Sequence, residues 1–216
     1  MTSHITSTAR RLRMHFVAAV AVSALLLTGC NPGGDPNSGG TSSGAPTASS
    51  TASPSPTPTA TPVYVPASAS GRAQNVPVPV LPEVAKKETK EGLEAFVSYW
   101  YSTLSYAYET GDTKPLESVS GPGCVFCSGL REGVAEAWNE GRWVSGGTIE
   151  TPSVEARFTS GAPSLATIQV LQKQTEIRNA DGSLYQAPSL ATNAASQATA
   201  AFNDGRWLLT DLGLIR

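Results

Sequence analysis

Cys124 and Cys127 are the residues whose type and spacing point most directly to chemistry, because Cys124-Val-Phe-Cys127 has the CxxC spacing. Such a pair forms a small structural disulfide, exchanges disulfides with other thiols, or supplies two ligands to a zinc site. A zinc site needs two further ligands. The chain has one other cysteine, and its two histidines, His4 and His15, lie near the amino terminus. The pair therefore predicts a structural disulfide or a redox site rather than a metal site.

The third cysteine, Cys30, ends a segment that has the pattern of an export signal. Three arginines precede an apolar stretch, residues 16–27, whose 12 residues fall short of the ~20 that a membrane span needs. The stretch runs into Leu27-Thr28-Gly29-Cys30, which resembles the lipobox of bacterial lipoproteins. The resemblance implies a signal peptide of residues 1–29, cleavage between Gly29 and Cys30, diacylglycerol on the Cys30 thiol, and an acyl chain on its new amino group. The alternative is an ordinary signal followed by a chance cysteine.

The lipobox resemblance also implies a location, the extracytoplasmic face of the cell membrane. Two or more acyl chains hold a protein stably on a bilayer, whereas one holds it only marginally. We expect no cofactor other than the lipid on Cys30, and the membrane is the expected partner. Because this setting is oxidising, it favours a disulfide between Cys124 and Cys127.

The charge balance excludes several classes of function. Removal of the signal takes away Arg10, Arg11 and Arg13, which leaves 12 basic residues against 17 acidic ones. An acidic chain without a basic cluster is not expected to bind nucleic acid or to grip anionic lipid through lysines and arginines. Both histidines leave with the signal as well, so a Ser-His-Asp triad, a Cys-His pair and a His-ligated metal site are excluded.

Residues 30–82 have the composition of a linker. Residues 31–82 contain 11 of the 16 prolines of the chain, together with many serines, threonines and glycines. Such a segment buries too little apolar surface to offset the entropy of ordering, so we expect a disordered, partly polyproline-II spacer. The Ser/Thr-Pro tracts also suggest O-linked sugar, and a recognition peptide is the alternative to a spacer.

Residues 83–216 are long enough for one domain with its own core. Apolar residues at steps of three and four predict one long helix over residues 83–110, ended by Gly111. A short helix should follow, and a further helix over residues 128–140.

After Trp143 the apolar residues alternate, which predicts strands. We expect them over residues 148–158, over 165–178, in the later part of 186–202, and from Arg206 to Ile215, with a tight turn at Asn203-Asp-Gly205. Helices followed by an antiparallel meander predict an α+β domain.

Aromatic residues on the first helix are candidates for lining a pocket. Tyr99 and Tyr106 are seven residues apart, as are Tyr101 and Tyr108, and Trp100 lies beside them. This spacing predicts two aromatic stripes next to the buried face of the helix. The alternative interpretation is core packing with the hydroxyl groups at the rim.

The order of the elements, with the final hairpin Phe-Asn-Asp-Gly-Arg-Trp-Leu-Leu-Thr-Asp-Leu at 202–212, resembles the nuclear-transport-factor-two-like, or SnoaL-like, cone. That fold implies amino-terminal helices packed on a curved antiparallel sheet, often around a central pocket. The lipobox, the linker and the segment Gly-Pro-Gly-Cys-Val-Phe-Cys-Ser-Gly-Leu at 121–130 together resemble an uncharacterised family of actinobacterial lipoproteins, whose function is unknown.

No convergent pair of carboxylates suits general acid-base catalysis, so no catalytic residue is predicted. Asp204 belongs to the turn, and Asp211, Glu150 and Glu155 are expected on solvated faces. We therefore expect a non-catalytic domain that binds a small ligand or a partner from the cell wall or envelope. The alternatives are a small SnoaL-like enzyme that uses the cone pocket and a thiol-disulfide redox protein that uses Cys124 and Cys127. The sequence leaves the oligomeric state open.

Overall fold

The computed structural model describes residues 62–215. The predicted signal peptide (1–29), the predicted cleavage and lipidation site at Gly29 and Cys30, and the predicted linker up to residue 61 lie outside these residues. They remain predictions from the sequence.

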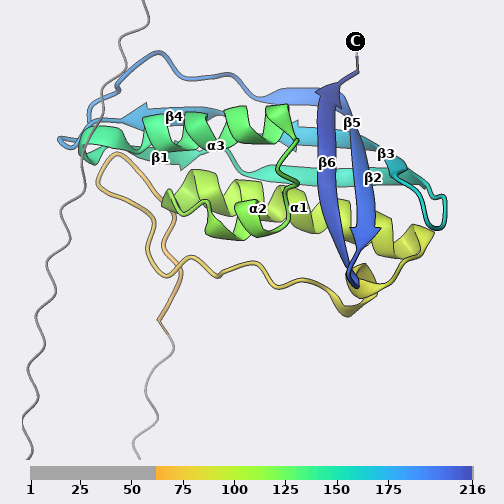
Figure 1. Ribbon diagram of the computed structural model, residues 1–216. Helices are drawn as coiled ribbons and strands as arrows, with labels where there is room; N and C mark the ends of the chain where they lie inside the picture. Colours follow the sequence, from red (N-terminus) through yellow and green to blue (C-terminus); the bar gives the residue numbers. More distant parts are fainter. Residues whose placement is uncertain (1–61, 216) are drawn as a thin grey trace, which may run out of the picture. The chain divides into compact units, whose positions relative to one another are not determined.

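Within residues 62–215 the chain forms helices first and strands afterwards (Figure 1). Two short 3-10 helices are η1 (Glu83–Lys86) and η2 (Asn139–Gly141). The α-helices are α1 (Lys90–Thr110), α2 (Lys114–Ser118) and α3 (Val125–Ala137). The strands are β1 (Trp143–Gly146), β2 (Ile149–Arg157), β3 (Ser164–Gln172), β4 (Thr175–Arg178), β5 (Thr192–Asn203) and β6 (Arg206–Leu214).

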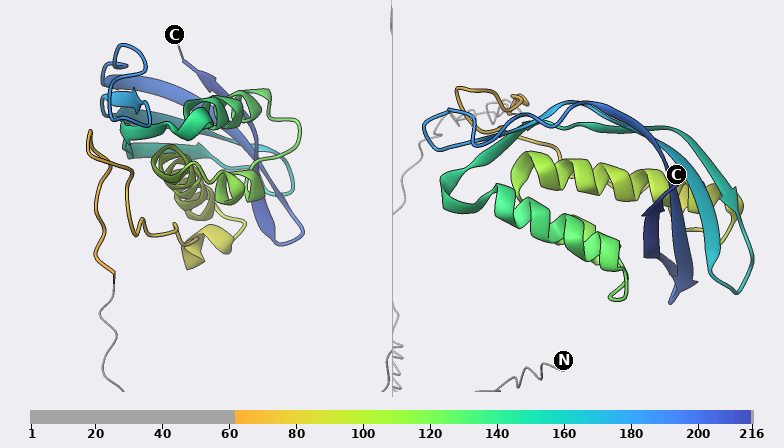
Figure 2. Two further views of the ribbon diagram at one scale, coloured as in Figure 1. Left: turned by 90° about the vertical axis from the view of Figure 1, so that its left-hand side faces the viewer. Right: turned by 90° about the horizontal axis from the view of Figure 1, so that it is seen from above.

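The strands form a four-stranded antiparallel sheet in the order β2-β3-β5-β6 and a separate antiparallel pair of β1 and β4. The larger sheet is curved, and α1 and α3 lie within its curve (Figure 2). Buried side chains line the inner face of its two middle strands. They include Ala166 and Ile168 on β3 and Ala198 and Ala200 on β5. The predicted α+β class, helices packed on a curved antiparallel sheet, is confirmed.

Helix α1 forms the centre of the core. Leu93, Phe96, Val97 and Trp100 are fully buried along one face, as their spacing predicts. The helix ends at Gly111, which has a φ of 76° and donates its backbone N–H to the carbonyl of Ala107. A residue with a side chain would be strained at this φ, so glycine is the favoured stop.

The predicted single helix over residues 83–110 is wrong at its start, because residues 87–89 interrupt it. The carbonyl of Lys87 accepts a hydrogen bond from Nε1 of Trp207 on β6, at 3.0 Å, and so leaves the helical ladder. Thr89 is extended and caps α1 by accepting the N–H of Gly92. A Cβ on Gly92 would lie 2.1 Å from the Lys87 carbonyl oxygen. The close approach of these two backbone segments therefore requires glycine at position 92.

The strand predicted over residues 165–178 is two strands, β3 and β4, that join different sheets. The break coincides with Gly146, whose φ is 74° and where a Cβ would lie 2.3 Å from the Gln174 carbonyl oxygen. The short strand β1 was not predicted. In contrast, the turn at Asn203–Arg206 is confirmed, since Asp204 and Gly205 both have positive φ, 51° and 74°.

Residues 63–82, here called the strap, were assigned to the linker by composition, but the structure folds them against the domain. The strap therefore packs against the domain that we expected to begin at residue 83. Val65 and Gln74 exchange backbone hydrogen bonds, and Arg72 donates to the carbonyl of Gly141 at 2.9 Å. These contacts are made by backbone groups and by one long side chain. They produce no periodic pattern of hydrophobic residues, so the sequence did not reveal them.

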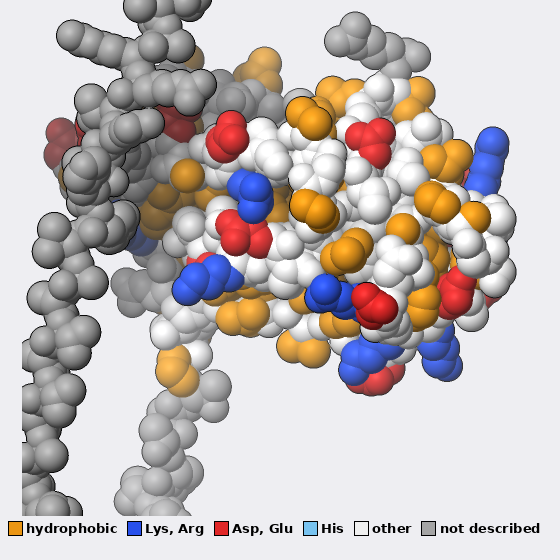
Figure 3. Space-filling model, viewed as in Figure 1, with side chains coloured by type: hydrophobic (Ala, Val, Ile, Leu, Met, Phe, Trp, Pro, Cys, Tyr) orange, Lys and Arg blue, Asp and Glu red, His pale blue; other side chains and the backbone are white. Residues whose placement is uncertain are grey.

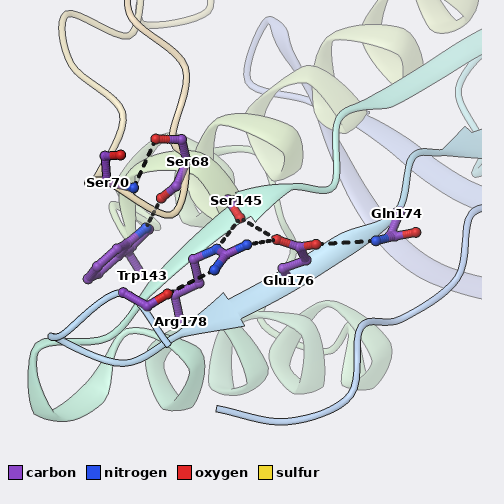
Figure 4. A network of polar contacts seen from close by, with 8 residues as sticks. Ser68, Ser70, Trp143, Ser145, Gln174, Glu176 and Arg178 are labelled. Atoms are coloured by element: carbon purple, nitrogen blue, oxygen red, sulfur yellow. Dashed lines mark hydrogen bonds and ion pairs between the residues drawn. The ribbon is translucent and has the colours of Figure 1, made fainter. Parts of the chain in front are cut away.

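A network of polar contacts joins the strap to the β1–β4 pair (Figure 4). Trp143 donates its indole N–H to the carbonyl of Ser68 at 3.0 Å. Beside it, Glu176 pairs with Arg178 and accepts from Ser145, the latter at 3.3 Å. The Arg178 guanidinium lowers the pKa of Glu176. Every group in this network has a partner, which indicates a structural role.

Candidate functional site

A pocket of about 290 Å³ lies between α1, α3 and the inner face of the sheet. We call it the central pocket. Most of its lining is apolar, and the few polar groups are uncharged. Its lining residues are Tyr101, Leu104 and Tyr108 from α1, Phe126 and Leu130 from α3, and Ile149, Val170, Gln172, Thr192, Ala194, Ser196, Leu212 and Leu214 from the strands.

The α1 stripe that contains Tyr101 and Tyr108 faces this pocket. The two tyrosines are two helical turns apart and so share one face of α1. The Tyr101 hydroxyl donates to Oγ of Ser196 at 3.0 Å, and Ser196 in turn donates to the carbonyl of Gly213 at 2.9 Å. This chain of hydrogen bonds fixes the phenol ring of Tyr101 at the wall of the pocket.

Burial raises the pKa of both pocket tyrosines. For Tyr101 a hydrogen bond with Ser196 partly offsets this effect, and for Tyr108 a hydrogen bond with Gln172 does so. Both phenols are therefore neutral at physiological pH. They can exchange hydrogen bonds with a ligand, but neither can act as a base.

The other predicted pocket residues lie elsewhere. Trp100 is fully buried in the core and donates to Oγ of Ser120 at 2.9 Å. Tyr99 lies beside Phe96 and Trp207 in a separate surface depression. Tyr106 faces the strap. The structure thus brings together only Tyr101 and Tyr108 of the five aromatic residues.

Cys124 and Cys127 form a disulfide, with their Cα atoms 5.3 Å apart, at the start of α3. Helix α3 was predicted to begin at Ser128 but begins at Val125, because Cys124 caps it through a contact from the Cys127 N–H to Sγ at 3.2 Å. Both cysteines are buried. An attacking thiolate needs access to a sulfur atom, so this burial supports a structural bond.

The disulfide also places a pocket residue. Phe126 lies between the two cysteines, lines the central pocket and is 40% exposed. The disulfide closes a ring that includes Phe126, and so restricts the backbone that holds this side chain at the edge of the pocket. On the face that carries α3 and β6, hydrophobic side chains reach the surface among uncharged polar groups and charged side chains of both signs (Figure 3).

The carboxylates considered in the sequence do not line the central pocket. Glu150 pairs with Lys173 at 3.3 Å, Glu155 and Asp211 are exposed on the strands, and Asp204 lies in the final turn. Of the residues that the structure describes, none that lines the central pocket is charged. Within residues 62–215 no group of three or more histidines, cysteines or carboxylates is arranged to hold a metal ion.

Sequence reasoning missed the strand side of the pocket. Thr192, Ala194 and Ser196 lie on the same face of β5, and their alternation in the sequence was a usable signal. Gln172 gave no signal, because its position beside Tyr108 arises only when β3 packs against α1.

No helix within residues 62–215 has the length and hydropathy needed to cross a bilayer.

Several solved structures of other proteins are similar to this chain. The intermembrane-space region of the chloroplast protein ARC6 matches with 12% identity and a TM-score of 0.45, over 59% of this chain and 96% of that one. Aln2 from a Streptomyces species matches with 10% identity and a TM-score of 0.40, over 60% and 94%. An uncharacterised protein with a cystatin-like fold from Caulobacter vibrioides matches with 12% identity and a TM-score of 0.39, over 60% and 92%. These likenesses assign no activity.

No curated protein matches the chain in sequence. Residues 62–213, more than half of the chain, match the profile of DUF6318, a family of unknown function. The match begins at the strap and ends in β6, so it covers every residue that lines the central pocket except Leu214. The chain therefore belongs to the DUF6318 family of unknown function.

Proposed function

We propose that this protein is a lipid-anchored lipoprotein of the extracytoplasmic membrane face whose domain binds an uncharged, mainly apolar small molecule in the central pocket. The observation that carries the proposal is the lining of that pocket. Apolar side chains from α1, α3 and four strands surround a space of about 290 Å³, and its polar groups are neutral. A concave apolar site with a few placed polar groups is the usual form of a small-molecule site.

Binding accounts for this site better than catalysis does. General acid-base chemistry needs a group that changes protonation near the working pH. The titratable groups of the pocket are Tyr101 and Tyr108, and burial raises the pKa of each away from that range. The buried disulfide likewise favours a structural role over the redox alternative.

Direct binding to the purified domain tests the pocket. N-phenyl-1-naphthylamine is uncharged and gains fluorescence in apolar surroundings, so it serves as the probe. Ala194→Phe fills the pocket and should abolish the gain. Ala195→Phe is the matched control, because Ala195 is the next residue of β5 and is exposed on the opposite face of the sheet. Equal fluorescence with both variants, at unchanged melting temperatures, would contradict the proposal.

The anchor is tested separately in cells of the source organism. Incorporation of an alkyne-labelled palmitate and recovery in the membrane fraction should both be lost in Cys30→Ala. Thr41→Ala, in the predicted linker, is the control and should keep both. Labelling of Cys30→Ala at the level of the unmodified chain would remove the lipoprotein part of the proposal.

A further inference from the structure

A second hollow adjoins the central pocket along α3. It has a volume of about 310 Å³, and we call it the α3 groove. One wall is the face of α3 that contains Gly129, Gly133 and Ala137, and the other contains Ile177 of β4 and Leu190 of the loop before β5. Leu190 is 79% exposed, so it forms an apolar rim rather than part of the core.

The two hollows share Tyr108, Leu130, Gln172 and Thr192 as lining residues. They are therefore neighbouring compartments that meet at these four side chains. Leu130 is on α3 and Thr192 starts β5, so the shared residues come from both walls of the α3 groove. Tyr108 lies at the boundary between the two hollows.

Gly129 and Gly133 are exposed and leave free space on the side of α3 that borders the groove. An added Cβ on Gly129 or Gly133 would meet no atom within 4 Å outside the helix backbone. Glycine in a helix interior costs about 1 kcal/mol relative to alanine. Here that cost brings no closer packing, unlike at Gly92 in α1, where the Lys87 carbonyl occupies the space. What the two glycines provide is room on the groove side of α3.

The chemistry of the lining defines what fits both compartments. In the part of the chain that the structure describes, neither compartment has a lysine, arginine, aspartate or glutamate among its lining residues. A carboxylate or ammonium group would be desolvated there without a partner, at a large cost in free energy. Neutral hydrogen-bonding groups are present where the compartments meet, at Tyr108 and Gln172.

We infer that the site takes a chain-like ligand, a hydrocarbon chain with an uncharged oxygen function such as an alcohol or ester, that extends from the central pocket into the α3 groove. The inference rests on the proposed function and specifies its ligand class. A compact apolar molecule would need only the central pocket, whereas a chain-like one uses both.

Displacement of N-phenyl-1-naphthylamine by 1-octanol and by 1-dodecanol tests the inference. Gly133→Leu blocks the α3 groove without meeting an existing atom at its Cβ, and should also favour the helix. We expect the affinity for dodecanol to fall at least about tenfold, the equivalent of two buried methylene groups. The affinity for octanol should stay unchanged.

Ala135→Leu is the matched control, because it adds a leucine to an exposed position of the same helix that lines neither compartment. It should leave both affinities unchanged. If Gly133→Leu also leaves both unchanged while Ala194→Phe abolishes both, the site ends at the central pocket and the inference is overturned. If the unmodified domain binds neither the probe nor an alcohol, the proposed function itself fails. Melting temperatures of all variants exclude unfolding as the cause, and Gly129→Val gives a second way to block the groove.

Discussion

Helices α1 and α3 lie within the same curved sheet but are held in different ways. The buried face of α1 carries large side chains, with Leu93, Phe96 and Trp100 fully enclosed. Helix α3 buries Val134 and its disulfide, and leaves hollows beside Leu130 and Gly133. The difference predicts that α1 contributes more than α3 to the stability of the domain, whereas α3 packs more loosely beside the two hollows.

The largest effect that this comparison predicts is the loss of a core side chain from α1. Trp100→Ala should lower the free energy of unfolding by about 3–5 kcal/mol, because it leaves a cavity and removes the hydrogen bond that Oγ of Ser120 accepts from the indole N–H. Leu130→Ala in α3 should cost less, since Leu130 is only partly buried and already borders a hollow. Urea unfolding followed by tryptophan fluorescence or circular dichroism measures both. Equal losses would contradict the distinction between the helices.

A smaller loss is expected when glycine is replaced in α1. The Cβ of Gly92→Ala would approach the Lys87 carbonyl oxygen to 2.1 Å, so the turn before α1 has to move. We expect a destabilisation of about 3 kcal/mol, at the upper end for overpacking. Thermal unfolding measures it. An unchanged melting temperature would show that the backbone at Gly92 does not approach the Lys87 carbonyl so closely.

The disulfide compensates for the sparse packing of α3 at its amino-terminal end. Replacing Cys124 and Cys127 together by serine should cost about 2 kcal/mol, the loop-closure value for so short a ring. Because both sulfurs are buried, dithiothreitol should leave the bond intact in the folded domain and reduce it once urea is added. Counting free thiols with and without urea tests this, and rapid reduction without urea would revive the redox interpretation.

The same substitution that harms α1 should help α3. Gly133→Ala meets no neighbouring atom and removes flexibility from the unfolded chain, so the domain should gain about 0.5–1 kcal/mol. The change in sign relative to Gly92→Ala is the sharpest form of the comparison. A loss of stability in Gly133→Ala would mean that α3 packs closely after all.

The smallest effect concerns pH. Burial raises the pKa of Tyr101 and Tyr108 in the folded domain, while the unfolded chain loses these protons near pH 10. Their contribution to stability is present below about pH 10 and is lost as the pH rises through the higher folded values. Tyr101→Phe should therefore make the decline in stability above pH 10 shallower. Urea unfolding at a series of alkaline pH values checks the slope.

Local patterns predicted much of the fold. The apolar spacing on α1, the stop at Gly111 and the turn at Asp204-Gly205 follow from rules that act over a few residues, and all are present. The strap and the short strand β1 were missed, because their partners lie far away in the sequence. The candidate site was half predicted, since Tyr101 and Tyr108 share a helical face whereas Gln172 and Ser196 reach them only across the fold.

The sequence by itself determined the α+β class, the buried face of α1 and the pairing of Cys124 with Cys127, because period and spacing act locally. Only the tertiary structure decided which aromatic stripe meets the sheet, that α1 is interrupted at Lys87, and that hollows remain beside α3. Each of these depends on how closely separate elements approach one another, and that distance is set by side chains and backbone groups that come from distant parts of the chain.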